Sequence, residues 1–249
     1  MSRPRRWQQP LDRFLLDRGY DECRSSRLAD TKNGEIMSAT FAAFRQAFQR
    51  TDPIATERVP LPPNALLDER PDFRALLDDM GGQALNRGIY RLLEGRLFSV
   101  ASQFVATAFP AWPGRLVPFG CDWMGRIYAV DGSDRRVNGE RSLCLLDPAT
   151  RDLLDVPTTI LEFHNDMLVK EPELPLEETL WRSWLSTHPG GLSYVQLAGW
   201  RRPGFLGGEL ALENLEIQPA SVYWDLAGQM IAQVFKLPPG THIREVTIS

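Results

Sequence analysis

"GRLVPFGCDWMGRIYAVDG", residues 114–132, contains two short apolar runs, each bounded by glycine or aspartate. Two further runs follow, "RSLCLLDPAT" (141–150) and "RDLLDVP" (151–157), with Asp-Gly and Asp-Pro-Ala-Thr as the turn sequences. Runs of this length between turn residues predict short strands joined by tight turns. We therefore expect four consecutive strands that form an antiparallel meander.

Helical patterns lie on both sides of this meander. Phe41, Phe44 and Phe48 recur at three- and four-residue spacing in residues 37–50, with Ser38 as the expected N-cap. The order of helices, meander and helices predicts an α+β fold, with helices covering one face of an antiparallel sheet. The other expected elements are helices at 71–82 (begun by Pro71, ended by Gly81 and Gly82), 97–110, 159–169 (capped by Thr158), 175–186 and 219–235 (opened by Pro219), short strands at 87–93 and 242–248, and an extended connector at 51–67.

The first 36 residues differ from the rest of the chain. They contain seven Arg and one Lys against six acids, a balance of +2. Because the net charge of the whole chain is −4, the remaining 213 residues carry a charge of −6. We expect residues 1–36 to be a poorly packed leader, with Met37 as one interpretation of the natural start. The alternative is a short helix around residues 10–18 that packs on the body. Residues 37–249 are expected to form a single α+β domain, with a division into a helical part (37–110) and a sheet-plus-helix part (111–249) as an option.

Composition excludes several classes of partner. A mildly acidic body argues against direct nucleic-acid binding, which needs a basic face, and is compatible with a basic protein partner. No apolar stretch approaches the roughly 18 residues of a membrane span, and the N-terminus has no apolar segment of export-signal length. Cys23, Cys121 and Cys144 form neither a CxxC pair nor an even framework. We therefore expect a cytoplasmic protein without a membrane partner.

The search for catalytic motifs is mostly negative. The sequence contains no GxxxxGK loop, no HExxH and no GxSxG elbow. Isolated histidines are expected to be surface or hydrogen-bonded residues, and paired acids are expected to lie on a solvated face. We predict no enzyme, no metal site and no cofactor. The residues weighed in this way are His164, His188, His242, Asp78 with Asp79, Asp131 with Asp134, and the acids of 171–178.

"GFLGGELALENLEI" (204–217) places two adjacent glycines before an acidic run. A dinucleotide-binding loop needs G-x-G-x-x-G, and the glutamates that follow Gly207 and Gly208 would repel a phosphate. The glycines therefore predict a tight turn or a close backbone approach. Beside them, Trp200 with Arg201 and Arg202 is typical of a protein interface. The alternative is that Trp200 and Phe205 are core and the arginines pair with local glutamates.

Two stretches resemble bacterial immunity proteins of the kind found beside polymorphic or type VI secretion toxins. The resemblance covers roughly residues 37–248 and is specific over 115–131 and 199–240. The chain is similar to the C-terminal immunity domain of DNase-toxin antidotes and more distantly to the SUKH superfamily. One departure is that Gly204 and Arg201–Arg202 replace a more apolar or lysine-containing pattern. The matching residues are Phe119, Gly120, Asp122, Trp123, Gly125, Arg126, Asp131 and the turn 147–150, then Gly199, Pro203, Phe205 to Gly208, Asn214 to Glu216 and Val222 to Trp224.

This resemblance implies a cytosolic antidote that binds a cognate toxin domain, often a nuclease, and blocks its active site. A basic toxin domain is the expected partner. The alternatives are a SUKH-like scaffold or regulator, and a hydrolase that reverses a toxin's modification through Asp122, Asp131, Asp134 or His164. The expected toxin contacts are Asp134, Trp200, Arg201, Arg202, Glu209 and Glu213. Residues expected to be structural are Asp122, Trp123, Gly125, Asp131, Gly207, Gly208 and Trp224.

Overall fold

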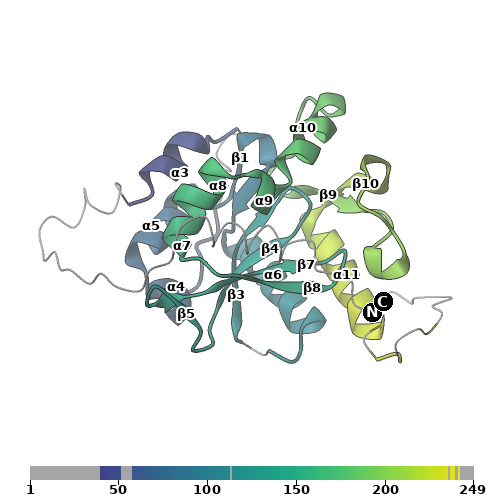
Figure 1. The fold of residues 1–249 in the computed structure, drawn as a ribbon, viewed down its shortest axis with the longest axis horizontal. Coiled ribbons are helices and arrows are strands. Elements are labelled where there is room, and N and C mark those ends of the chain that lie inside the picture. Colours follow the sequence, from purple (N-terminus) through teal and green to yellow (C-terminus); the bar gives the residue numbers. More distant parts are fainter. Residues whose placement is uncertain (1–39, 52–57, 113, 235, 239–240, 242–249) are drawn as a thin grey trace, which may run out of the picture.

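An antiparallel sheet organises the computed structural model, which describes residues 40–51, 58–112, 114–234, 236–238 and 241. The sheet has six strands in the order β1-β2-β3-β4-β7-β8 (Figure 1). Its last four strands are the predicted meander, and the short hairpin β5–β6 is inserted between β4 and β7. The bounds are β1 Gln83–Leu85, β2 Tyr90–Leu92, β3 Leu116–Asp122, β4 Ile127–Asp131, β5 Arg136–Val137, β6 Glu140–Arg141, β7 Leu143–Asp147 and β8 Asp152–Val156.

Helices precede and follow the meander, so the α+β fold class predicted from the sequence is confirmed. A second, two-stranded sheet pairs β9 (Gln196–Trp200) with β10 (Leu215–Pro219). The helices are α3 Ala42–Ala47, α4 Ala65–Asp68, α5 Pro71–Met80, η1 Asn86–Gly88, α6 Gly95–Ala108, α7 Ile160–Glu162, η2 Phe163–Met167, α8 Leu168–Lys170, α9 Glu173–Leu176, α10 Glu178–Thr187, η3 Gly204–Leu206, η4 Leu212–Asn214 and α11 Ala220–Val234.

Both faces of the central strands are covered, so the expectation of helices on one face is wrong. Every residue of β3 and β4 is buried, which a sheet with one wet face cannot achieve. On one face, aromatic rings from α3 and α5 pack on the strands: Phe44 meets Tyr90, and Phe73 meets Phe119. Helix α6 packs against β3, and α11 packs against α6, to cover the other face (Figure 1).

Helices with strong local signals form where they are expected. Pro71 occupies the first turn of α5, and Gly81 is its C-cap. Helix α6 begins after Glu94, whose carboxylate accepts the N–H groups of Arg96 and Leu97. Helix α11 begins one residue later than predicted, because Pro219 ends β10.

Two predicted helix starts and one connector need correction. Helix α3 begins after Phe41, and Ser38 lies outside the described residues. Thr159, rather than Thr158, caps α7, in a capping box that it closes with Glu162. The connector expected over 51–67 contains the start of α4, whose N-cap is Asn64.

The helix predicted over 175–186 is broken into α9 and α10. Glu177 lies between them in a left-handed conformation, with φ 50° and ψ 51°. The preceding carbonyl groups accept hydrogen bonds from Tyr128 of β4 and from Trp123 in the turn after β3: Pro175 accepts from Tyr128 (2.5 Å), and Leu176 accepts from Trp123 (2.8 Å). These bonds turn the chain away from a continuous helical path. The helical pattern of residues 175–186 cannot predict this break, because the donors lie far away in the sequence.

The sequence does not predict strands β1, β5, β6, β9 and β10. Strand β9 joins the body through a bond from the Ala198 N–H to the Trp123 carbonyl (2.8 Å). The six-stranded sheet draws strands from both sides of residue 110. The expected leader 1–36, Met37 and the strand 242–248 lie outside the described residues.

Across the described ranges, the helices are too short or too polar to cross a bilayer.

Candidate functional site

The turn after β3, residues 122–126, contains a buried ion pair. Asp122 accepts the N–H groups of Met124 (3.0 Å) and Arg126 (2.8 Å), and its second oxygen lies 2.6 Å from Arg126 Nε. The two side chains are 0% and 4% exposed. Arg126 also donates to the Pro175 carbonyl (2.8 Å) and approaches Glu177. Both oxygens of Asp122 therefore accept hydrogen bonds from within the turn, so the side chain stabilises the fold and does not face a ligand.

Aromatic side chains lock this turn to the surrounding helices. The Trp123 ring packs against Trp181 and Trp184, with centroids 5.2 and 5.8 Å away. Trp224 of α11 donates from its indole nitrogen to the Gly125 carbonyl (2.8 Å). Gly125 has φ 82°, and a Cβ there would lie 2.7 Å from Leu197, so the position requires glycine.

Asp131 and His164 also have internal partners. Both Asp131 oxygens lie 2.6 Å from Arg115, and one also accepts the Ser133 N–H. These bonds outweigh burial and lower the pKa of Asp131 to about 2. His164 is fully buried, with Nδ1 2.7 Å from the Ile160 carbonyl and Nε2 3.2 Å from the Tyr90 hydroxyl. Burial lowers the pKa of His164 to about 4, so its ring is neutral at pH 7.

The remaining paired acids are mostly engaged at the surface. Asp78 pairs with Arg74, and Asp79 pairs with Arg45 and Arg50. In the part of the chain that the structure describes, no group of three or more His, Cys, Asp or Glu could hold a metal ion. Burial also raises the pKa of the Cys121 thiol to about 12 and that of Cys144 further, so both are inert as nucleophiles. Cys23 and His242 lie outside the described residues.

Residues 201–214, between β9 and β10, form the Asn214 loop. The Asn214 side chain accepts the Arg202 N–H (2.9 Å) and donates to the carbonyls of Arg202 and Glu209 (2.9 Å each). Gly207 has φ 82°, and a Cβ on Gly208 would lie 1.8 Å from the Arg202 carbonyl oxygen. The glycine pair therefore makes a tight turn with a close backbone approach.

Charged side chains of the Asn214 loop face solvent. Arg201 pairs with Glu216 (3.0 Å), and Arg202 donates to the Leu206 carbonyl (2.7 Å). Glu209 and Glu213 are exposed and form no ion pair with any described residue. The loop thus holds two acids in fixed backbone positions without using their charges.

The predicted contact residues divide into three groups. Arg201, Arg202, Glu209 and Glu213 lie together on the Asn214 loop. Trp200 is only 9% exposed at the end of β9, which agrees with the core alternative, and Phe205 is half-buried against the same core. Asp134 is exposed beside β5, and Figure 1 places β5 far from β9 and β10.

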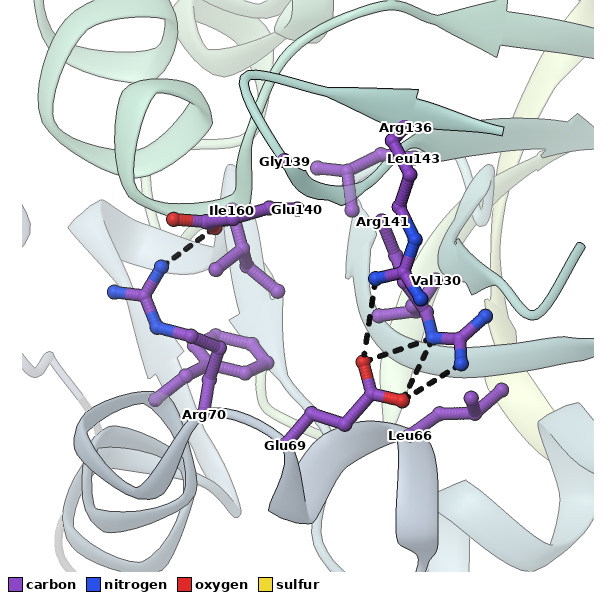
Figure 2. Close-up of a pocket in the computed structure, with 11 residues that line it drawn as sticks. Leu66, Glu69, Arg70, Val130, Arg136, Gly139, Glu140, Arg141, Leu143 and Ile160 are labelled. Carbon is purple, nitrogen blue, oxygen red and sulfur yellow. Dashed lines mark hydrogen bonds and ion pairs between the residues drawn. The ribbon is translucent and has the colours of Figure 1, made fainter. Parts of the chain in front are cut away.

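Sequence reasoning missed a pocket beneath the β5–β6 hairpin (Figure 2). Its volume is about 160 Å³, and its walls come from segments between residues 66 and 160. Apolar side chains line its interior and charged side chains its rim. Only the charged hairpin sequence "DRRVNGER" (134–141) hints at it. The apolar residues are Leu66, Phe73, Val130, Leu143 and Ile160; the charged residues are Glu69, Arg70, Arg136, Glu140 and Arg141.

Comparisons with known proteins identify no family. No family model matches the chain, and no curated protein matches it. Among solved structures, the chain is similar to the crystal structure of Atu4351 from Agrobacterium tumefaciens, with 15% sequence identity and a TM-score of 0.49. The match covers 70% of this chain and 83% of that chain. At this level, the similarity assigns no function.

Proposed function

We propose that this chain is a cytoplasmic immunity protein that binds a cognate secreted toxin domain, a nuclease, and occludes its active site. The observation that carries this proposal is the Asn214 loop, which presents Glu209 and Glu213 at the surface with their charges uncompensated by described residues. The loop belongs to residues 199–240, one of the two stretches that resemble toxin antidotes. Together these features favour a surface built to bind a basic protein.

Charge gives a physical reason for such a pairing. Residues 37–249 carry −6, whereas a nuclease holds its phosphate backbone on a basic surface. The acidic body would be drawn towards that surface, which accelerates association at low salt. Fast association is useful to an antidote, because the toxin must be blocked before it reaches its substrate.

Backbone order gives a second reason. Side chain and backbone bonds from Asn214, together with the bond from the Gly204 N–H to the Ala149 carbonyl (2.7 Å), fix the loop to the body. A surface that is ordered before binding loses less conformational freedom when the complex forms. The loop is therefore suited to rigid occlusion of a partner.

The hydrolase alternative receives less support from the geometry. Asp122, Asp131 and His164 each use their polar atoms in contacts within the fold. The fourth residue of that alternative, Asp134, is exposed beside β5, and it would have to act on a substrate without the other three. The structural roles of Asp122, Asp131 and His164 favour binding over turnover.

Co-expression with the C-terminal domain of the toxin encoded beside this chain tests the proposal. We expect growth rescue and a 1:1 complex on a sizing column. The double variant Glu209→Lys/Glu213→Lys should lose both, whereas Glu171→Lys, an exposed acid in another part of the chain, should keep both. Rescue without a complex would favour the hydrolase, and failure of both would favour a scaffold with other partners.

A further inference from the structure

The pocket beneath the β5–β6 hairpin has the size of one aromatic ring. Its volume of about 160 Å³ is close to the roughly 150 Å³ of an engineered apolar cavity that admits benzene. It is well below the roughly 300 Å³ or more of pockets for drug-sized ligands. A nucleotide or a large cofactor is therefore too big for this pocket.

Charged side chains lie on both sides of the pocket, Arg70 with Glu140 on one side and Glu69 with Arg136 and Arg141 on the other (Figure 2). Val130, Leu143, Ile160 and Phe73 are buried against the core and can contact a ring by dispersion. The rim comprises three arginines and two glutamates, and Asp72 adds a third acid that pairs with Arg70, so Arg136 carries the least compensated charge. A ligand that suits both parts has an apolar ring and one negative charge.

The rim residues differ in how fully they are paired. Glu69 accepts from Arg141 at 2.7 to 2.9 Å through both of its oxygens, and Glu140 lies 2.5 Å from Arg70. Arg136 is different: its nearest acid is Glu69 at 3.7 Å, and its guanidinium makes no hydrogen bond to a described residue. Its side chain is 41% exposed at the mouth of the pocket. Arg136 is thus the rim cation with donors to spare.

We propose that this pocket binds a small aromatic carboxylate, with the ring against the apolar wall and the carboxylate on Arg136. A guanidinium can hold a carboxylate through two parallel hydrogen bonds, which suits a group presented at the rim. A cationic ligand is disfavoured, because both rim glutamates already have arginine partners. The site is separate from the Asn214 loop, and the ligand is either a free acid or the C-terminal residue of a peptide.

Titration of the full chain with 3-phenylpropionate tests this inference. The methyl resonances of Val130, Leu143 and Ile160 should shift and saturate. Arg136→Gln should weaken binding about tenfold, because the change removes the charge-assisted hydrogen bonds to the carboxylate. The uncharged amide, 3-phenylpropanamide, should bind the wild-type chain as weakly as 3-phenylpropionate binds Arg136→Gln.

Arg135→Gln is the matched control. Arg135 is the preceding residue, is 53% exposed, pairs with Asp155 and does not line the pocket, so its loss should leave binding unchanged. Equal or tighter binding of the peptide Gly-Gly-Phe would identify a chain terminus as the source, and preference for 3-phenylpropionate would identify a free acid. Unshifted methyl resonances, or equal binding by Arg136→Gln and wild type, would overturn the proposal.

Discussion

The turn 122–126 and the Asn214 loop contain the same residue types, but the turn buries its charges and the loop exposes them. Each contains an acid, an arginine and a glycine that the backbone requires. In the turn, Asp122 and Arg126 are buried against each other. In the loop, Glu209 and Glu213 remain exposed.

The difference lies in which side chain satisfies the backbone. In the turn, a carboxylate accepts the N–H groups, so the charge is buried and needs Arg126 as its counterion. In the loop, the neutral amide of Asn214 bonds the backbone groups instead, so no charge is buried. The loop acids are then free for intermolecular contact, whereas the turn acid is committed to stability.

The largest effect should come from Asp122→Asn. The change removes the nearest counterion of the buried Arg126 guanidinium, and breaking such a pair costs about 3–5 kcal/mol. Urea unfolding should show this loss. Asp155→Asn, which breaks the exposed pair with Arg135, should cost at most about 1 kcal/mol. Equal losses would remove the distinction between buried and exposed acids.

Gly208→Ala should come next. Its Cβ would lie 1.8 Å from the Arg202 carbonyl oxygen, so the backbone of the loop must move, at a cost of about 1–3 kcal/mol. Gly190→Ala is the matched control, because a Cβ there meets nothing within 4 Å. Its unfolding free energy should change by less than about 0.5 kcal/mol. If the two variants unfold alike, the loop is not held by this close approach.

Asp131 is an intermediate case, with a buried carboxylate and a half-exposed partner, Arg115. The folded-state pKa of Asp131, about 2, lies below the unfolded value near 4. At pH values above 4, ionised Asp131 therefore stabilises the fold by up to about 2 kcal/mol. The contribution should disappear as the pH falls from 4 to 2. Urea unfolding of wild type and Asp131→Asn at pH 7, 4 and 3 measures it, and a gap that does not narrow would contradict the assignment.

Glu213→Lys should have the smallest effect on stability, below about 0.5 kcal/mol, because the side chain is exposed and has no described ion-pair partner. Its effect should instead appear as slower association with the toxin domain at low salt. Stopped-flow mixing at two salt concentrations measures this, with Glu171→Lys as the control. A rate that matches the control would place the binding surface elsewhere.

Local signals explain what the sequence could predict. Pro71 and Gly81 bound α5 by their own backbone preferences, and the Asp-Pro-Ala-Thr turn joins β7 to β8 as expected. The Asp131-Gly132 turn ends β4 but leads into the β5–β6 hairpin, which separates β4 from β7. The close approach at Gly207 and Gly208 was likewise inferred from glycine and the neighbouring acids. In each case, the residues that decide the structure lie within a few positions of one another.

Long-range contacts explain what it could not. The break at Glu177 depends on Trp123 and Tyr128, roughly fifty residues away along the chain. The pocket requires α4, α5, the β5–β6 hairpin and the sheet to meet, and no single segment carries its pattern. Trp200 could be read as core or interface because its burial depends on the whole fold.

The most direct test of toxin binding is a stoichiometric titration of the toxin domain's nuclease activity with this chain. We predict a linear loss of activity that reaches zero at one equivalent, together with slower association in high salt. Complete inhibition by a small fraction of an equivalent would contradict occlusion, because it would require each molecule to act repeatedly.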